Sequence, residues 1–318
     1  MTPDIDRKRV FIFVAVTYGI TVAGAVAMFL SGGASSDFAP QTTLAGVVML
    51  AIAFAPALGN IVTRLITREG WSNMLLWPKV RRGWPAYLAA GILPLIAIVL
   101  GGAIYFLIFP GELDLSMAYA RETGRVAAAG TPAAVLGREM LERLSLIPLL
   151  TFVIWGEEFG WRAYLLPKLM PLGGRKAVLL LGAIWGVFHW PMIFLGFQYG
   201  LRYWGAPVVG PLLFVLIILS PSVVYSWMTL RTGSIWPACL AHAVNNALCV
   251  MTTYLVRGEP NALIGPGVEG IVGCLGYILV ALPILLIPSA LAHHAPVASR
   301  AVGVSEPTAY SADPVTAS

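Results

Sequence analysis

Long apolar runs recur at eight places along the chain, and short stretches between them carry most of the charge. The runs cover residues 10–30, 44–66, 85–109, 143–166, 177–197, 208–230, 233–256 and 268–291. A helix of about 20 residues is about 30 Å long and matches the hydrocarbon core of a bilayer. Backbone groups in lipid must find hydrogen bonds within the protein, so runs of this length favour helices. The pattern therefore predicts an all-α, polytopic transmembrane helical bundle with about eight spans.

Composition agrees with this prediction. Hydrophobic residues make up 58% of the chain and charged residues only 11%, and the mean hydropathy is +0.82. Soluble domains carry about 25% charged residues, so this chain lacks the polar side chains to cover a water-facing surface. A cytosolic enzyme and a nucleic-acid partner are excluded, and membrane lipids are expected around the bundle. We expect a single membrane domain over residues 1–291 and a disordered cytoplasmic tail, rich in Ala, Pro, Ser and Thr, over 292–318.

The basic residues predict the orientation of the bundle. With eight spans, one side of the membrane holds fourteen of them and the other side six. The larger group comprises Arg7, Lys8, Arg9, Arg64, Arg68, Lys79, Arg81, Arg82, Arg162, Lys168, Arg175, Lys176, Arg231 and Arg300. The smaller group comprises Arg121, Arg125, Arg138, Arg143, Arg202 and Arg257. Basic loops remain cytoplasmic, so both termini are expected in the cytoplasm. The Ala-, Gly- and Val-rich composition favours a bacterial plasma membrane.

Segment 68–84 combines basic residues with Trp71, Trp77 and Trp84. This composition is typical of a stretch that lies in the membrane interface against anionic headgroups. It is equally typical of a basic loop that only fixes the orientation of the protein. The sequence leaves both interpretations open.

Polar and ionisable side chains within the predicted spans are concentrated in three places. The clusters are Glu157, Glu158 and Arg162 in "WGEEFGWRAYLLP", His189 in "GAIWGVFHWP", and His242, Asn245 and Asn246 in "LAHAVNNAL". Such residues are costly in a bilayer, so each is a candidate for function.

Helical spacing assigns different roles to the two adjacent glutamates. Glu158 and Arg162 are four residues apart, so they share a helix face and are expected to form an ion pair. Glu157 lies about 100° around the helix and lacks that partner, which leaves its carboxylate available for chemistry. His242 and Asn246 lie one turn apart on one face of another helix.

The three clusters also coincide in depth. At about 1.5 Å per residue, Glu157, His189 and His242 lie roughly 13, 18 and 14 Å from the cytoplasmic ends of their spans. Each residue alone is explained by helix packing, and Asn245 is expected to bond to a neighbouring helix. Gly182 and Gly186 similarly indicate a face for close helix packing. Three clusters at one level favour a common site.

The chemistry that these groups can perform is hydrolysis. A buried carboxylate can act as general base toward a water, and a histidine can hold that water. A second histidine and an amide can stabilise the oxyanion of a tetrahedral intermediate. Alternatively, Glu157, His189 and His242 form a ligand set for a catalytic zinc. The chain lacks an H-E-x-x-H motif, an intramembrane aspartate pair and a G-x-S-x-G elbow.

The ordered motifs resemble those of the CPBP family, which comprises type II CAAX prenyl endopeptidases and bacteriocin-processing or immunity-associated membrane proteins. The motifs are Glu157-Glu158-x-x-x-Arg162, Trp185-x-x-x-His189 and His242-x-x-x-Asn246. The resemblance covers about residues 140–255. One departure is Trp185, where the family usually has Phe, so an aromatic is kept but the cavity shape near His189 can differ.

The resemblance implies a role for each motif residue. Glu157 matches the catalytic glutamate and His189 the histidine that helps to hold the water. His242 and Asn246 match the pair that stabilises the oxyanion. Glu158 and Arg162 match supporting positions, and Trp185 keeps the aromatic of the second motif.

The sequence thus predicts an intramembrane endopeptidase that cleaves a peptide bond at the cytoplasmic side of the membrane. Its substrate is a peptide or membrane protein, and a prenylated C-terminus fits as well as a leader peptide. The glycines around Glu157 and the missing H-E-x-x-H motif favour a mechanism without a cofactor, with zinc as the alternative. The alternative from another functional class is a non-catalytic membrane scaffold or an immunity-type protein with the same fold. A small-solute transporter is disfavoured because no internal repeat is evident.

Overall fold

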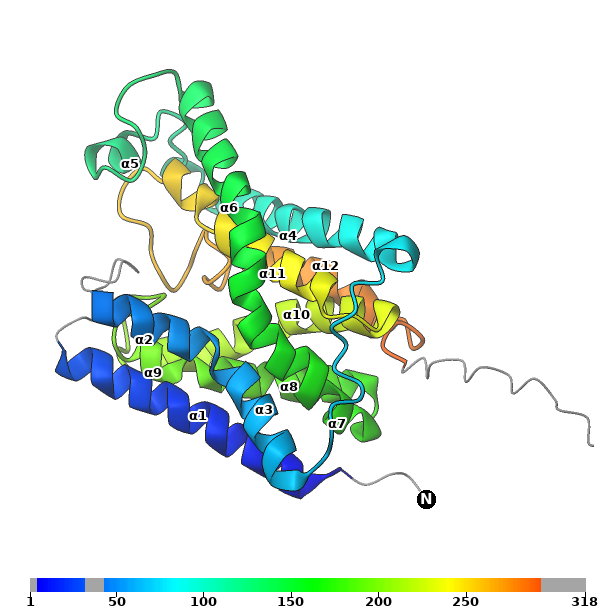
Figure 1. The fold of residues 1–318 in the computed structure, drawn as a ribbon. Coiled ribbons are helices and arrows are strands. Elements are labelled where there is room, and N and C mark those ends of the chain that lie inside the picture. The colour runs from blue at the N-terminus through cyan, green and yellow to red at the C-terminus, as the bar shows by residue number, and fades with distance from the viewer. Residues whose placement is uncertain (1–4, 32–42, 293–318) are drawn as a thin grey trace, which may run out of the picture.

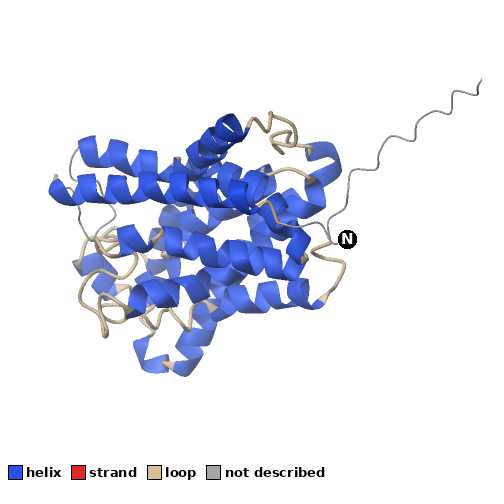
Figure 2. Cartoon of the chain, turned by 90° about the horizontal axis from the view of Figure 1, so that it is seen from below, coloured by secondary structure: helices blue, strands red, loops and turns tan. Residues whose placement is uncertain are grey.

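The structure is a computed structural model, and it describes residues 5–31 and 43–292. Within these ranges every regular element is a helix, and the only strand-like contact is an isolated bridge between Leu113 and Val256. Figure 2 shows the helices crossing one another in a bundle joined by loops. The all-α helical bundle is thereby confirmed. The predicted tail over 292–318 lies, apart from residue 292, outside the described residues.

The helices follow the predicted runs in order (Figure 1). In the first half they are α1 (Arg7–Leu30), α2 (Thr43–Ala53), α3 (Ala55–Thr67), α4 (Val80–Ile108), α5 (Ala118–Glu122) and α6 (Pro132–Gly160). In the second half they are α7 (Leu166–Leu169), α8 (Gly174–Phe188), α9 (Trp190–Ile193), α10 (Val209–Thr232), α11 (Trp236–Leu248) and α12 (Leu275–Leu286). A π-helical turn, Trp161–Leu165, joins α6 to α7.

Four of the described helices are long and apolar enough to cross a membrane, which makes the chain a membrane protein. They are Arg7–Leu30, Val80–Ile108, Gly174–Ile193 and Val209–Thr232, and the bent pair Ala45–Ala53 and Ala55–Thr67 provides a fifth if it is one broken span. Helix α6 carries charged residues in its first half, and α11 and α12 have only 13 and 12 residues. The count of eight spans therefore stays a prediction.

The eighth predicted run begins too early. Residues 268–274 form turns, and the helix starts only at Leu275. The physical reason lies in the sequence "IGPGVEGIVG", because Gly265 adopts a positive φ of 115° and the glycines and Pro266 interrupt helical hydrogen bonding. A loop rather than a helix thus precedes α12.

One end of the bundle gathers basic side chains from several helices. Arg9 Nε at the start of α1 lies 3.4 Å from Glu69 Oε2 just after α3, and Lys168 in α7 also pairs with Glu69. Arg175 at the start of α8 donates a hydrogen bond to Leu286 O at the end of α12, at 3.0 Å. Burial would raise the pKa of Glu69, but the contacts with Lys168, Tyr164 and Arg9 outweigh it and lower this pKa.

Two glycines of α6 allow this helix to pack closely against the break between α2 and α3. A β-carbon at Gly156 would lie 2.9 Å from Ala53 O, and one at Gly160 would overlap Pro56. The two glycines lie on either side of Glu157 and Glu158, so the carboxylates are placed where α6 touches α3 most closely. The π turn then begins at Trp161, and such turns recur at functional sites.

The predicted packing face on α8 is confirmed. A β-carbon at Gly182 would lie 2.9 Å from the Ser222 side chain, and one at Gly186 would lie 2.8 Å from Val215 Cα. Both neighbours belong to α10, so glycine lets α8 and α10 approach closely. This contact holds the C-terminal end of α8, where His189 lies, against the centre of the bundle.

The tryptophans of segment 68–84 are exposed, with 48% of Trp71, 78% of Trp77 and 60% of Trp84 accessible. Arg64, counted among the basic residues of this side, is instead buried within the protein. Its Nε donates to Asn60 Oδ1 at 2.7 Å and its Nη1 to Gly70 O at 2.8 Å. It therefore closes the end of α3, and the membrane role of the segment stays a prediction.

Candidate active site

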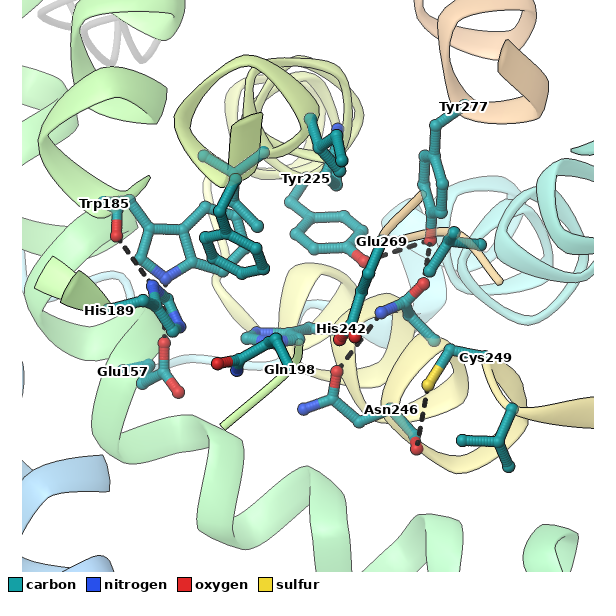
Figure 3. A pocket seen from close by; sticks show the side chains of 17 residues that line it. Glu157, Trp185, His189, Gln198, Tyr225, His242, Asn246, Cys249, Glu269 and Tyr277 are labelled. Atoms are coloured by element: carbon teal, nitrogen blue, oxygen red, sulfur yellow. Dashed lines mark hydrogen bonds between the residues drawn. The ribbon is translucent and has the colours of Figure 1, made fainter. Parts of the chain in front are cut away.

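A cavity of about 480 Å³ in the middle of the bundle brings the four candidate residues together. Glu157 reaches it from α6, His189 from the C-terminal end of α8, and His242 and Asn246 from α11 (Figure 3). Side chains from α10, including Phe214, form much of the apolar wall. Three motifs that are distant in sequence thus line one space.

The Glu157 carboxylate is buried and has one neighbouring donor. Trp185 Nε1 donates a hydrogen bond to Glu157 Oε2 at 2.9 Å. No ion pair between Glu157 and Arg162 occurs among the described residues, in agreement with the helical spacing. The sequence predicted that Trp185 keeps the aromatic of its motif, and the structure adds that its indole N–H orients the Glu157 carboxylate.

The predicted ion pair between Glu158 and Arg162 is confirmed. Arg162 Nη1 lies 2.9 Å from Glu158 Oε1, and both side chains are fully buried. The Arg162 guanidinium also lies 4.3 Å from the centroid of the Trp185 ring. Trp185 therefore touches the buried cation with its ring face and the Glu157 carboxylate with its edge.

His242 has a partner that helical spacing did not reveal. Its Nδ1 lies 2.9 Å from Glu158 Oε1, the oxygen that also accepts from Arg162. Because an ionised carboxylate only accepts hydrogen bonds, Nδ1 carries the proton and Nε2 is left for the cavity. The ring stacks on Tyr225, with centroids 5.5 Å apart.

His189 is held by the end of its own helix. Its Nδ1 lies 2.8 Å from Trp185 O, one turn back along α8. A carbonyl only accepts, so Nδ1 carries the proton and the lone pair on Nε2 remains available. Phe214 packs against the ring at 4.9 Å between centroids.

A chain of hydrogen bonds orients Asn246. Tyr277 OH on α12 donates to Asn245 Oδ1 at 2.9 Å, and Asn245 Nδ2 donates to Asn246 Oδ1 at 3.2 Å. Since its oxygen is taken, Asn246 has its Nδ2 donors left for a ligand (Figure 3). The prediction that Asn245 bonds to a neighbouring helix is confirmed.

The cavity also contains polar residues that the sequence analysis did not single out. These are Gln198, Tyr225, Glu269 and Tyr277. Glu269 precedes the last helix and so escaped an analysis based on helical spacing. The sequence feature that could have identified it is its position as a single acidic residue inside an apolar run. Gln198 adopts a positive φ of 65°, which no spacing rule could indicate.

The candidate zinc ligands Glu157, His189 and His242 have donor atoms of the types that zinc prefers. Within residues 5–31 and 43–292, however, no group of three His, Cys, Asp or Glu side chains has the arrangement to hold a metal ion. Zinc binding by these three residues stays a prediction.

Comparison with known proteins gives matches over the region that carries the motifs. Residues 140–248 match the family described as type II CAAX prenyl endopeptidase Rce1-like. A stretch of 92 residues is 33% identical to the "CAAX prenyl protease 2" of Methanococcus maripaludis, covering 28% of this chain and 34% of that relative. The chain thus matches about a third of the relative's length. The resemblance derived from the three motifs is confirmed over this region.

Proposed function

We propose that the protein is an intramembrane endopeptidase that hydrolyses a peptide bond with Glu157 as general base. The observation that carries this proposal is the convergence of Glu157, His189, His242 and Asn246 on one cavity. The similarity to type II CAAX prenyl endopeptidases spans all four residues. Peptide hydrolysis needs a base, a held water and oxyanion donors, and this set supplies each of them.

The nucleophile is a water between Glu157 and His189. His189 Nε2 accepts one of its hydrogens, while Glu157 takes the other proton as the water oxygen attacks the carbonyl carbon of the substrate. Trp185 keeps the carboxylate in place, since its Nε1 is bonded to Oε2 at 2.9 Å. The carbonyl double bond becomes a single bond to an oxyanion.

Asn246 and His242 stabilise that oxyanion. Asn246 Nδ2 donates because its amide oxygen is bonded to Asn245. His242 Nε2 donates to the oxyanion when it carries a proton, while Nδ1 stays bonded to Glu158 Oε1. When the carbonyl re-forms, the C–N bond breaks and the leaving nitrogen receives the proton held by Glu157. Products are a carboxylic acid and an amine.

The cavity faces the cytoplasmic half of the membrane in this proposal. The end of the bundle that holds Arg9, Lys168 and Arg175 has the charge expected of a cytoplasmic surface. The N-terminal helix would then begin in the cytoplasm of a bacterial cell, with the substrate cleaved at or near the membrane.

The test is cleavage of a peptide library by purified protein in lipid nanodiscs, followed by mass spectrometry. The library contains prenylated and unprenylated sequences, with free and amidated C-termini. Wild type is expected to cleave a subset, and Glu157→Ala none. Glu259→Ala is the matched control, because Glu259 is exposed and does not line the cavity. Equal cleavage by Glu157→Ala would show that Glu157 is not the general base, and no cleavage by wild type would favour the non-catalytic scaffold.

A further inference from the structure

The cavity contains a second carboxylate that the proposed hydrolysis does not use. Glu269 lines the same space as Glu157 but comes from the loop before α12. In Figure 3 Glu157 and His189 lie at one side of the cavity, and Glu269 lies at the other side, together with Asn246 and Cys249. The cavity therefore has two acidic positions at separate places.

The Glu269 side chain has no partner of its own. Among the described residues none donates a hydrogen bond to its carboxylate, and none forms an ion pair with it. The residue is only partly buried, and its carboxylate reaches into the cavity (Figure 3). A carboxylate in poorly hydrated surroundings is costly unless a donor or a cation meets it.

Hydrogen bonds hold the backbone around Glu269 in place. Glu269 O accepts a hydrogen bond from the buried Tyr199 OH at 2.9 Å. Ile271 N donates to Leu263 O at 2.8 Å, and Val272 N donates to Ile264 O at 2.9 Å, so the loop doubles back on itself. The carboxylate is thus presented by a loop with its own hydrogen bonds.

The rest of the lining offers no permanently charged cation to this carboxylate. No lysine or arginine lines the described cavity, and Arg162 lies behind the Trp185 ring. Gln198 and Asn245 also line the cavity and are uncharged. This side of the cavity suits a hydrogen-bond donor, most strongly a cationic one, and repels an anion.

We propose that Glu269 is a specificity-determining residue that binds a lysine or arginine side chain of the substrate near the scissile bond. This inference rests on the proposed peptidase function and names its substrate class. The preferred substrate is an internal peptide segment with a basic residue, whose aliphatic stem can pack on the apolar lining of the cavity. A substrate that brings a free C-terminal carboxylate to this side of the cavity is disfavoured.

The test is a positional scan of a peptide that wild type cleaves. Each position near the scissile bond is made lysine, norleucine or glutamate in turn, and kcat and KM are measured. One position should favour lysine over norleucine by about 10- to 100-fold in kcat/KM, mainly through KM. Glutamate there should abolish cleavage. A peptide whose C-terminus falls at that position should be cleaved better when the C-terminus is an amide than when it is a free carboxylate.

Two substitutions at Glu269 link this preference to the carboxylate. Glu269→Gln should equalise lysine and norleucine peptides while cleavage of the norleucine peptide stays within about threefold of wild type. Glu269→Asp keeps the charge and should keep a reduced lysine preference. Glu259→Gln, in the same loop but exposed and outside the cavity, should behave as wild type.

Binding separates this inference from the proposed activity. Fluorescent lysine and norleucine peptides are titrated into Glu157→Gln protein in nanodiscs, with and without Glu269→Gln. A lysine preference that disappears with Glu269→Gln supports the inference even if no peptide is ever cleaved. A preference that survives Glu269→Gln overturns it, as does equal binding of the two peptides. An equal fall in kcat for every peptide also overturns it, because Glu269 would then act in catalysis.

Discussion

Trp185 donates a hydrogen bond from Nε1 to Glu157 Oε2, at 2.9 Å, across the interface between α8 and α6. The face of the same indole lies 4.3 Å from the Arg162 guanidinium. One side chain thus separates the carboxylate that we assign to catalysis from the buried ion pair next to it. A phenylalanine at this position would keep the ring face but would lose the donor.

Glu157→Gln should remove turnover and leave folding intact. A glutamine still accepts the hydrogen bond from Trp185 but cannot take a proton from water. A general base contributes about 10²–10⁴-fold, so kcat should fall by that factor. The measurement is peptide cleavage together with the thermal unfolding midpoint. A variant that unfolds more easily than wild type would show that Glu157 has a structural role.

Glu158→Gln should harm folding before it affects chemistry. Glu158 Oε1 meets both Arg162 and His242, and the ion pair is fully buried. Its loss leaves the arginine charge without a partner, at a cost of about 3–5 kcal/mol. Thermal unfolding in detergent or nanodiscs measures this cost. Normal stability with lost turnover would contradict the division of roles between the two glutamates.

Chelation and Asn246→Ala together separate the two mechanisms. In the metal-free mechanism activity survives exhaustive chelation, and Asn246→Ala lowers kcat by about 10²–10³-fold because an oxyanion donor is lost. In a zinc mechanism chelators abolish activity, added zinc restores it, and Asn246→Ala is mild. Metal analysis of washed, active protein completes the comparison. One zinc per chain would end the metal-free proposal.

Gly160→Ala should destabilise the protein by about 1–3 kcal/mol, because its β-carbon would overlap Pro56. The control is Gly137→Ala in the same helix, where a β-carbon meets nothing within 4 Å. That change should be neutral or stabilise by up to roughly 1 kcal/mol. The two unfolding midpoints measure the difference, and equal values would rule out a tight contact between α6 and α3.

Glu69 should stabilise the protein in a pH-dependent way. Burial alone would raise its pKa, but Lys168 and its other partners lower it below the ordinary value near 4.5. A lowered pKa in the folded state means that the stabilisation is present above that ordinary value. It is lost as the pH falls through the folded-state pKa. Glu69→Gln should therefore cost roughly 1 kcal/mol at pH 7 and progressively less below pH 4. An unchanged difference across this range would contradict the assignment.

The sequence was enough to predict the features that depend only on residue spacing along one helix. The i,i+4 pair of Glu158 and Arg162 and the packing face of Gly182 and Gly186 follow from helix geometry alone. Contacts between helices did not follow, because they depend on how the helices are rotated and crossed. The bond from His242 to Glu158 joins residues 84 positions apart. Glu269 was missed because glycine and proline turned an apolar run into a loop.

The glycine contacts around α12 indicate which helices are needed, besides the segment similar to known endopeptidases, to form the complete cavity. A β-carbon at Gly276 would overlap Ala97, and one at Gly101 would overlap Gly273, so α4 lies directly against α12 and its preceding loop. That loop carries Glu269, yet neither α4 nor α12 belongs to the segment 140–248 that resembles known endopeptidases. A fragment cut at the limits of the similarity would lack one wall of the cavity. A transplanted unit therefore has to include α4 and α12, and also α3, which contacts α6 at Gly160.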